Sequence, residues 1–316
     1  MHTRKIQSVG GSTYSITLPK QWVIKNRLKE KDALSIIERN DMTLLVSRAG
    51  VTKNSSESIS VNLEEYPDNI EQIIFTLYYL GIENINLFTK QEIAKHTRAQ
   101  IRKALEHMGG TEIIYEDRKK ISIKTLLDKS KVDIKQIIFR MSLIIESSIN
   151  IFFEDFEIQE IGLNESELDR LYHLTAKIVT LSLINPEVLI SSGIVNVSSI
   201  PSYLLICKRL ENMGDGINHL AEYLDRTRVE IKGIKHVFDS MSASLKLSIQ
   251  FLLNMQKKVY SKTPPETIKV LRQSIFSIKD RAIQDYLDDM LRFLINIEEE
   301  TVNISFFNQL IAKGNL

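Results

Sequence analysis

The sequence predicts a multidomain protein with a small β-rich head, an α+β spacer domain and an all-α bundle. Three observations predict this order. The first residues alternate polar and apolar side chains as strands do, the next region mixes short strand-like and helical runs, and every long segment after Val132 has helical periodicity. With 316 residues, the chain is long enough for two or three domains. We expect the head at residues 1–48, the spacer at 58–126 and the bundle at 131–316.

The composition predicts a soluble protein whose net charge creates no strong electrostatic field. Hydrophobic residues make up 43% and charged residues 26%, while the net charge is only +1, so any contact with nucleic acid requires a local basic patch. The single cysteine, Cys207, excludes an intramolecular disulfide and favours a reducing, cytoplasmic location. Residues 2–5 do not open a signal peptide. The uncharged stretch 188–207 is broken by Gly193 and Pro201, so we expect no membrane insertion.

The head is expected to be all-β apart from one helical turn. Its predicted elements are strand-like alternation over 5–18 with an interruption at Gly10-Gly11, a helical turn at 21–26, and two strand-like runs at 33–38 and 43–46 joined by a turn at 39–41. A unit this small cannot easily close a core alone. We therefore expect it to form a homodimer.

Basic residues are concentrated in the head. Seven lysines and arginines lie within the first 31 positions against a single acid, Glu30. This density is the footprint expected of phosphate contacts, which makes DNA a candidate partner. The candidate DNA-binding residues are Arg4, Lys5, Lys20, Lys25 and Arg27. The alternative is that these are solvated side chains on a domain that serves dimerisation only.

Short motifs give the head a family resemblance. They are Arg4-Lys5-Ile6, Gly11, Ile16-Thr17-Leu18-Pro19-Lys20, Leu28 and Lys31-Asp32. Together they resemble the AbrB (SpoVT-AbrB, MazE-like) family of swapped-hairpin DNA-binding domains. Lys31-Asp32 stands where that family usually has Gly-Asp, which is a small departure in turn chemistry. The resemblance implies an interlocked dimer whose basic loops contact DNA.

The spacer region reads as strand, helix, strand, helix, strand, strand. The predicted elements are 59–63, 68–80, 84–88, 92–107, 112–115 and 121–123. Gly81 and Gly109-Gly110 mark the ends of its two helices. This pattern predicts a compact α+β domain.

The remaining chain predicts a bundle of about six helices, in two three-helix halves. The expected helices are 133–156, one that starts after Gly162 with Asn164 as its N-cap and ends near Asn185, 199–228, 231–260 and 267–311. The last two are separated near Pro264-Pro265, and a break within 267–311 would give a sixth helix.

Two pairs of carboxylates at i,i+4 spacing are the most informative feature of the bundle. Glu165 and Asp169 lie on one predicted helix, and Glu211 and Asp215 lie on the next. This spacing puts both members of a pair on one helix face. The two helices are joined through 186–199, and Asp169 and Asp215 are equally far from this connection, so the pairs should face each other.

Carboxylates that face each other at short range favour a metal site, because ionised acids without a positive partner repel each other at such distances. Carboxylates with an imidazole suit Mg, Mn, Fe or Zn. The candidate ligands are Glu165, Asp169, Glu211 and Asp215, with His173, His219 and Glu222 as weaker candidates. The alternative is a network of salt bridges in which Arg170, Lys208 and Arg209 neutralise the acids. Acids in the first turns of a helix are also favoured by the macrodipole alone.

The same residues resemble the PhoU family of phosphate-uptake regulators. The motifs are residues 165–172, residues 210–215 and Ala221-Glu222. That family has two three-helix repeats with an E(D)xxxD motif, which binds iron, zinc or other metals in several members. The order of head, spacer and bundle is similar to archaeal phosphate uptake regulators, and the resemblance covers nearly the whole chain.

The sequence departs from the PhoU pattern in both repeats. Gly216 and His219 stand where the family usually has His and Asn. In the second repeat, Leu287 and Leu291 occupy the places that Glu211 and Asp215 hold in the first. A second metal cluster is therefore not expected.

No catalytic motif is present: the sequence has no P-loop, GxSxG, HExxH or Cys/His pair at ligand spacing, and we expect no enzyme. A di-metal carboxylate enzyme is disfavoured because paired Glu-x-x-His ligand sets are missing. The resemblances imply a cytoplasmic, DNA-binding negative regulator of phosphate uptake, with a phosphate ABC-transporter ATPase or a signalling protein as partner. The alternative is a dimeric adaptor that docks on a phosphate transporter without binding DNA.

Overall fold

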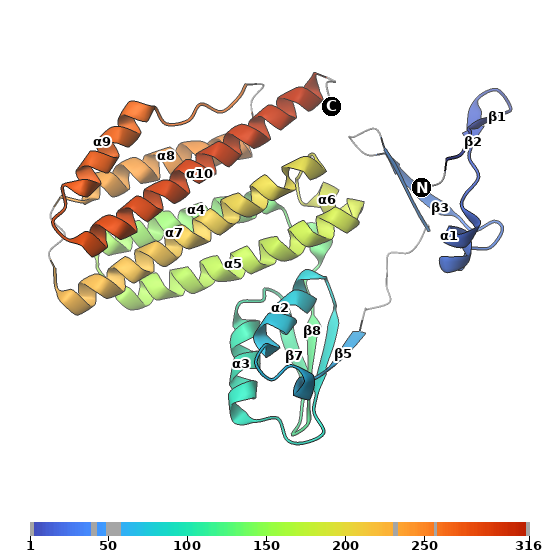
Figure 1. Ribbon diagram of the computed structural model, residues 1–316, viewed down its shortest axis with the longest axis horizontal. Helices are drawn as coiled ribbons and strands as arrows, with labels where there is room; N and C mark the ends of the chain where they lie inside the picture. The colour runs from blue at the N-terminus through green and yellow to red at the C-terminus, as the bar shows by residue number, and fades with distance from the viewer. Residues whose placement is uncertain (1–2, 39–42, 49–57, 230–232, 256–257, 314–316) are drawn as a thin grey trace. The chain divides into compact units, whose positions relative to one another are not determined.

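The computed structural model describes residues 3–38, 43–48, 58–229, 233–255 and 258–313. The chain divides near residue 55 into two compact units. The first is the head, drawn in dark blue in Figure 1, and the second comprises the spacer region and the helical part.

The head consists of two separate hairpins and one short helix. Strands β1 (Gln7–Val9) and β2 (Thr13–Ser15) form the first antiparallel hairpin, and β3 (Leu34–Glu38) and β4 (Leu44–Arg48) form the second. Helix α1 (Lys20–Lys25) lies between them in the chain. Gly10 and Gly11 adopt φ values of 65° and 79°, which L side chains rarely tolerate, and so permit the tight β1–β2 turn. The small β-hairpin head is confirmed, and the turn predicted at 39–41 lies outside the described residues.

None of the described head residues has a buried side chain. Seven large apolar side chains are 55% to 71% exposed: Ile6, Val9, Tyr14, Ile16, Ile24, Ile36 and Leu44. A single copy therefore encloses no hydrophobic core of its own. This exposure is consistent with the dimerisation expected from the sequence, because a second copy can cover these side chains.

The spacer region is a four-stranded sheet with two helices. Its elements are β5 (Ser58–Asn62), η1 (Leu63–Glu65), α2 (Ile70–Tyr79), β6 (Asn84–Phe88), α3 (Lys95–Glu106), β7 (Thr111–Glu116) and β8 (Lys120–Thr125). The strand order is β5-β6-β8-β7; β5 and β6 are parallel, and the other pairs are antiparallel. Ile74 of α2 and Ile101 of α3 pack in one core with Ile85 and Ile123 of the sheet. The expected α+β region is confirmed.

The rest of the described chain is helical. Its helices are α4 (Ile134–Glu154), α5 (Ile158–Ile184), α6 (Pro186–Ser191), α7 (Ile200–Thr227), α8 (Lys235–Leu253), α9 (Pro265–Phe276) and α10 (Arg281–Ala312), with short 3-10 turns η2 (Lys129–Lys131) and η3 (Val197–Ser199). Asp133 and Asp280 cap α4 and α10 by accepting from backbone N–H groups. Asn185 ends α5 and caps α6, so the connection predicted between α5 and α7 itself contains a short helix.

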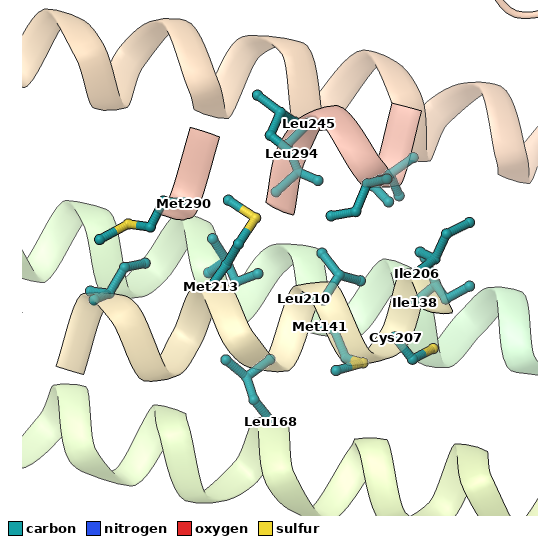
Figure 2. Packing of buried hydrophobic residues seen from close by; sticks show 14 of the residues in the cluster. Ile138, Met141, Leu168, Ile206, Cys207, Leu210, Met213, Leu245, Met290 and Leu294 are labelled. Atoms are coloured by element: carbon teal, nitrogen blue, oxygen red, sulfur yellow. The ribbon is translucent and has the colours of Figure 1, made fainter. Parts of the chain in front are cut away.

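Helix α7 packs against α4, α5 and α10. Figure 2 shows Leu210 and Met213 of α7 among side chains from the neighbouring helices, including Met141 of α4, Leu168 of α5 and Leu294 of α10. All five are at most 2% exposed. This packing fixes the position of α7 beside α5, and both helices carry the predicted carboxylates.

Helix α5 begins earlier than predicted. It starts at Ile158 and continues through Gly162 and Asn164, so the N-cap assigned to Asn164 is wrong. Ile161 is 1% exposed, and its burial extends the helix by a turn and a half beyond the point where glycine suggested a start. The Asn164 amide instead donates to Ser148 Oγ of α4 at 3.1 Å. Glu165 therefore lies two turns inside α5, where the macrodipole no longer accounts for an acid.

One described helix, α4, is long and apolar enough to cross a membrane by length and composition. One side of it faces the bundle core through residues such as Ile138, Met141 and Ile145, each at most 1% exposed. Core helices of soluble bundles pass the same test, and the arrangement is consistent with a soluble protein. The broken stretch 188–207 forms no continuous helix.

Candidate functional site

Three of the four predicted carboxylates meet between α5 and α7. One oxygen each from Glu165, Asp169 and Asp215 lies within 4.8 Å of the others. All three side chains are partly buried. This group is called the carboxylate cluster below.

Close contact between α5 and α7 holds the cluster together. The backbone of Gly214, next to Asp215, lies against Leu168, next to Asp169, with no space for a side chain. Gly216 faces Met290 of α10, where an added Cβ would lie 3.2 Å from Met290 Cγ. Glycine on α7 thus allows a close approach of both α5 and α10.

Among the ion pairs of the described residues, no lysine or arginine is paired with the carboxylate cluster. Arg170 donates from Nε and Nη2 to Glu167 at 2.7 Å each. The Arg209 guanidinium lies 5.6 Å from the centre of the Phe293 ring. Two of the cations required by the salt-bridge alternative are therefore directed elsewhere.

The third cation of that alternative, Lys208, is paired with Glu211 on the same helix. Glu211 is 6% exposed, and its Oε1 accepts from Lys208 Nζ, while its Oε2 has no hydrogen-bond partner in the described chain. Burial raises the pKa of Glu211 to about 7, Lys208 opposes this shift, and the charges of Asp215 and Asp169 add to it. Glu211 thus lies beside the carboxylate cluster but outside its three closely spaced donors.

Electrostatics within the carboxylate cluster oppose ionisation. Burial raises the pKa of Glu165, and the charges of Asp169 and Asp215 raise it further. Burial also raises the pKa of Asp215, with a contribution from Asp169, while the charges of Lys208 and His219 oppose this shift. The charge of Asp169 therefore disfavours the charged forms of Glu165 and Asp215, which is the condition that a bound cation relieves.

The weaker candidates are not part of the carboxylate cluster. His173 Nδ1 is hydrogen-bonded to Tyr79 Oη at 2.5 Å, and its ring stacks on Phe75 with centroids 4.2 Å apart. Burial lowers the pKa of His173 to about 4, so the ring is neutral near pH 7. His219 and Glu222 are exposed on α7. His173 thus serves the contact between the spacer region and α5.

A residue outside the predicted set, His107, lies next to the carboxylate cluster. It follows the last residue of α3, and its Nδ1 is 3.6 Å from Asp169 Oδ2. This Nδ1 atom is buried and has no hydrogen-bond partner in the described chain. In the sequence His107 precedes Met108 and Gly109 at a helix end, and no spacing relates it to α5. Only the packing of the spacer region on the bundle brings it there.

That packing is extensive on the α2 side. Lys177 of α5 is 2% exposed, with Nζ 4.0 Å from the centre of the Tyr78 ring of α2. Burial lowers the pKa of Lys177 to about 7. Tyr78 Oη donates to the Gly109 carbonyl at 3.0 Å, two residues after His107. The Lys177–Tyr78 contact and this hydrogen bond therefore tie the end of α3 to the α2–α5 interface.

The predicted second repeat carries no comparable group in the described chain. Leu287 and Leu291 are both fully buried. Asp285 pairs with Arg281 at 3.1 Å, and Asp289 pairs with Arg292 at 2.7 Å.

The five candidate DNA-binding residues of the head are all exposed. They are Arg4, Lys5, Lys20, Lys25 and Arg27. Two of them precede β1, two stand at the first and last positions of α1, and the fifth follows α1. All are free to contact solvent or a ligand in the single chain.

The comparisons with known proteins identify the head. A family model described as "Antidote-toxin recognition MazE, bacterial antitoxin" matches residues 7–54. The head is therefore an AbrB/MazE-like domain, consistent with dimerisation and DNA binding. Comparison of the whole chain with curated proteins and with solved structures gave no match, so the PhoU resemblance of the bundle stays a prediction.

Proposed function

We propose that the protein regulates phosphate uptake, binds DNA as a dimer through its head and binds a metal ion through its bundle. One observation carries the proposal. The same chain joins a MazE-like head to a bundle in which three carboxylates converge without a lysine or arginine partner among the described ion pairs.

DNA binding is supported by the head itself. Its five basic candidates are exposed, and the apolar side chains that a single copy leaves uncovered provide a surface for dimerisation. Two copies would present two sets of basic residues, which suits a two-fold DNA site.

Metal binding is supported by the donor set. Glu165, Asp169 and Asp215 supply oxygen ligands to one point, and the unpartnered Oε2 of the buried Glu211 is close enough for its charge to interact with two of them. Iron, zinc, manganese and magnesium all accept carboxylates. A bound cation would neutralise the carboxylate cluster and hold α5 against α7.

The phosphate-uptake part rests on the PhoU resemblance of residues 165–172 and 210–215. Under it, the protein is a cytoplasmic, non-enzymatic negative regulator, and a phosphate ABC-transporter ATPase or a signalling protein is its partner. Binding of the bundle to such a partner would connect metal state or phosphate status to the DNA-binding head.

The test combines metal analysis with DNA binding of the full chain. Purified protein is assayed by elemental analysis, and by fluorescence anisotropy with a duplex from upstream of phosphate-transporter genes of the same genome. A shuffled duplex of equal length and composition is the control. Stoichiometric metal and preference for the upstream duplex are expected. Absence of metal and equal binding of the two duplexes would contradict the proposal, whereas a dimer that binds neither duplex but binds the transporter ATPase would be the adaptor instead.

A further inference from the structure

His107, at the end of α3, lies beside the carboxylate cluster. Its Nδ1 is 3.6 Å from Asp169 Oδ2, which is too far for a good hydrogen bond, and it has no other partner in the described chain. Buried ring nitrogens without a partner are rare in folded proteins. An imidazole nitrogen and a carboxylate at this distance, without a good hydrogen bond between them, could both bind a third, positively charged group.

A metal ion provides such a group. Nitrogen and oxygen ligands bind zinc at about 2.0–2.2 Å, which separates two ligands of one tetrahedral ion by roughly 3.4 Å. The distance from His107 Nδ1 to Asp169 Oδ2 is close to this value. A second unpartnered atom, Glu211 Oε2, belongs to a side chain that is 6% exposed and whose charge interacts with Asp169 and Asp215.

We propose that His107 of the spacer region is the fourth ligand of the bundle's metal ion, so that the ion joins α3 to α5 and α7. This inference rests on the metal site of the proposed function. It also narrows the identity of the metal. Three carboxylates alone suit magnesium, whereas an added imidazole favours zinc, iron or another transition metal.

The consequence is a coupling between metal binding and packing of the spacer region. Phe75 on His173 and Tyr78 on Lys177 hold α2 on α5 without metal. The Tyr78–Gly109 hydrogen bond holds the residues after α3 to this interface, and His107 adds a contact with Asp169 that a metal ion can strengthen. If the ion binds His107, it stabilises this end, and by reciprocity the packed spacer region raises metal affinity.

The experiment compares the full wild-type chain with His107→Asn. The asparagine amide keeps a polar group of similar reach but removes the imidazole. Zn²⁺ and Co²⁺ affinities are measured by competition with a chelating indicator, Mg²⁺ affinity by calorimetry, and the visible Co²⁺ spectrum is recorded. We expect His107→Asn to weaken Zn²⁺ and Co²⁺ binding by about 10- to 100-fold, to alter the Co²⁺ spectrum, and to change Mg²⁺ affinity by less than about 3-fold.

Hydrogen exchange provides a second readout. In the wild type, Zn²⁺ should slow exchange of the last amides of α3, and in His107→Asn it should not. His96→Asn is the matched control, because His96 is exposed at the other end of the same helix. It should behave as the wild type in every assay.

The outcomes separate this inference from the proposed function. A wild type that binds no metal overturns the metal site itself. A His107→Asn chain with wild-type Zn²⁺ affinity and Co²⁺ spectrum overturns the inference and leaves a carboxylate-only site. Equal losses of Mg²⁺ and Zn²⁺ affinity, with metal-independent exchange at α3, would also overturn it, because they indicate a packing role.

Discussion

Gly214 of α7 lies directly against Leu168 of α5, and a Cβ on Gly214 would overlap the Leu168 Cδ1 atom. The two residues adjoin Asp215 and Asp169 in the sequence. The contact therefore sets the separation of the helices at the level of the carboxylate cluster. A helix-interior glycine costs roughly 1 kcal/mol relative to alanine, so its presence here corresponds to a packing requirement.

Gly214→Ala should destabilise the protein and weaken its metal site. Leu168 is 1% exposed and packs within the buried core, so an added methyl group has to displace it against other core side chains. Overpacking costs typically about 1–3 kcal/mol, partly offset by the better helix propensity of alanine. We expect a net loss of about 1–2 kcal/mol in urea unfolding, and a loss of bound metal because α5 and α7 separate.

Gly216→Ala is the control for this prediction. Its added methyl group would face Met290, whose flexible side chain can adjust by a few tenths of an ångström. Stability should stay within about 0.5 kcal/mol of the wild type. If both variants lose the same stability, the Gly214–Leu168 contact has no special role.

Asp169→Asn/Asp215→Asn should separate the effects of charge and metal. Without metal, the variant should be at least as stable as the wild type, because burial and then repulsion from Asp169 raise the pKa of Asp215, and a neutral amide avoids both penalties. Metal at about 100 times its dissociation constant should stabilise the wild type by about 2.7 kcal/mol and leave the variant unchanged. Thermal unfolding with and without Zn²⁺ measures both effects.

Asp285→Asn/Asp289→Asn is the matched control for the double variant. These acids have the same i,i+4 spacing but pair with Arg281 and Arg292 on the surface. Their replacement should leave the metal response intact. Equal metal stabilisation of all three proteins would place the ion elsewhere.

The sequence was sufficient to predict that Asp169 and Asp215 come together. Their spacing and the position of the connection between two helices determine it, and both are local properties. Glu211 was predicted as an equal partner, but Lys208, three residues before it on the same helix, binds one of its oxygens. Glu211 can pair either with Lys208 on its own helix or with the acids of the facing helix through a metal ion. The spacing of the residues in the sequence does not predict which of the two pairings forms.

The position of His107 beside the carboxylate cluster could not be predicted from the sequence. Its position depends on how α2 and α3 pack on α5, through contacts between residues about a hundred positions apart, such as Tyr79 and His173. Periodicity predicts each helix and its buried face, but it does not specify which face of the bundle the spacer region covers. The start of α5 was misplaced for a related reason, since burial of Ile161 outweighed the local signal of Gly162.

Lys177 predicts a specific dependence of stability on pH. Its pKa is lowered from 10.5 to about 7 by burial and by the charge of Lys129, with Glu83 opposing. Between these pH values the unfolded chain binds a proton that the folded chain does not, so this residue makes stability rise with pH from about 7 toward 10.5. Below pH 7 both states are protonated, and its contribution no longer changes.

Lys177→Met should remove this rise and increase stability at pH 7 by about 1–3 kcal/mol, because no amine has to be desolvated. Between pH 7 and 9.5 the wild type should gain up to about 3 kcal/mol relative to the variant, at about 1.4 kcal/mol per pKa unit. Urea unfolding at several pH values measures this difference. Lys246→Met, at a residue whose side chain is 61% exposed, should keep the wild-type slope; the same slope in Lys177→Met would contradict the argument.

Arg4→Ala/Lys5→Ala should weaken DNA binding and its dependence on salt. Each lost phosphate contact reduces the slope of log K against log salt by about 0.9. The loss should be similar for all duplexes if these side chains contact only phosphates. Anisotropy titrations from 50 to 200 mM salt, roughly the range over which such contacts dominate, measure the slope. Lys269→Ala/Lys279→Ala removes the same charge from exposed bundle residues and should leave the slope unchanged.

Dimerisation through the head predicts the last result. Ile36 of β3 is 63% exposed in the single chain, although it is a β-branched apolar residue in the middle of a strand. If a second copy covers it, Ile36→Asp should place an unpaired charge in the interface and dissociate the full-length dimer. Removal of residues 1–48 should give the same monomer in light scattering. Asp in place of Val270, an apolar bundle residue that is 59% exposed, should leave the dimer intact. An unchanged dimer mass after both head changes would show that the interface lies in the other compact unit, and the exposed apolar side chains of the head would then need another partner.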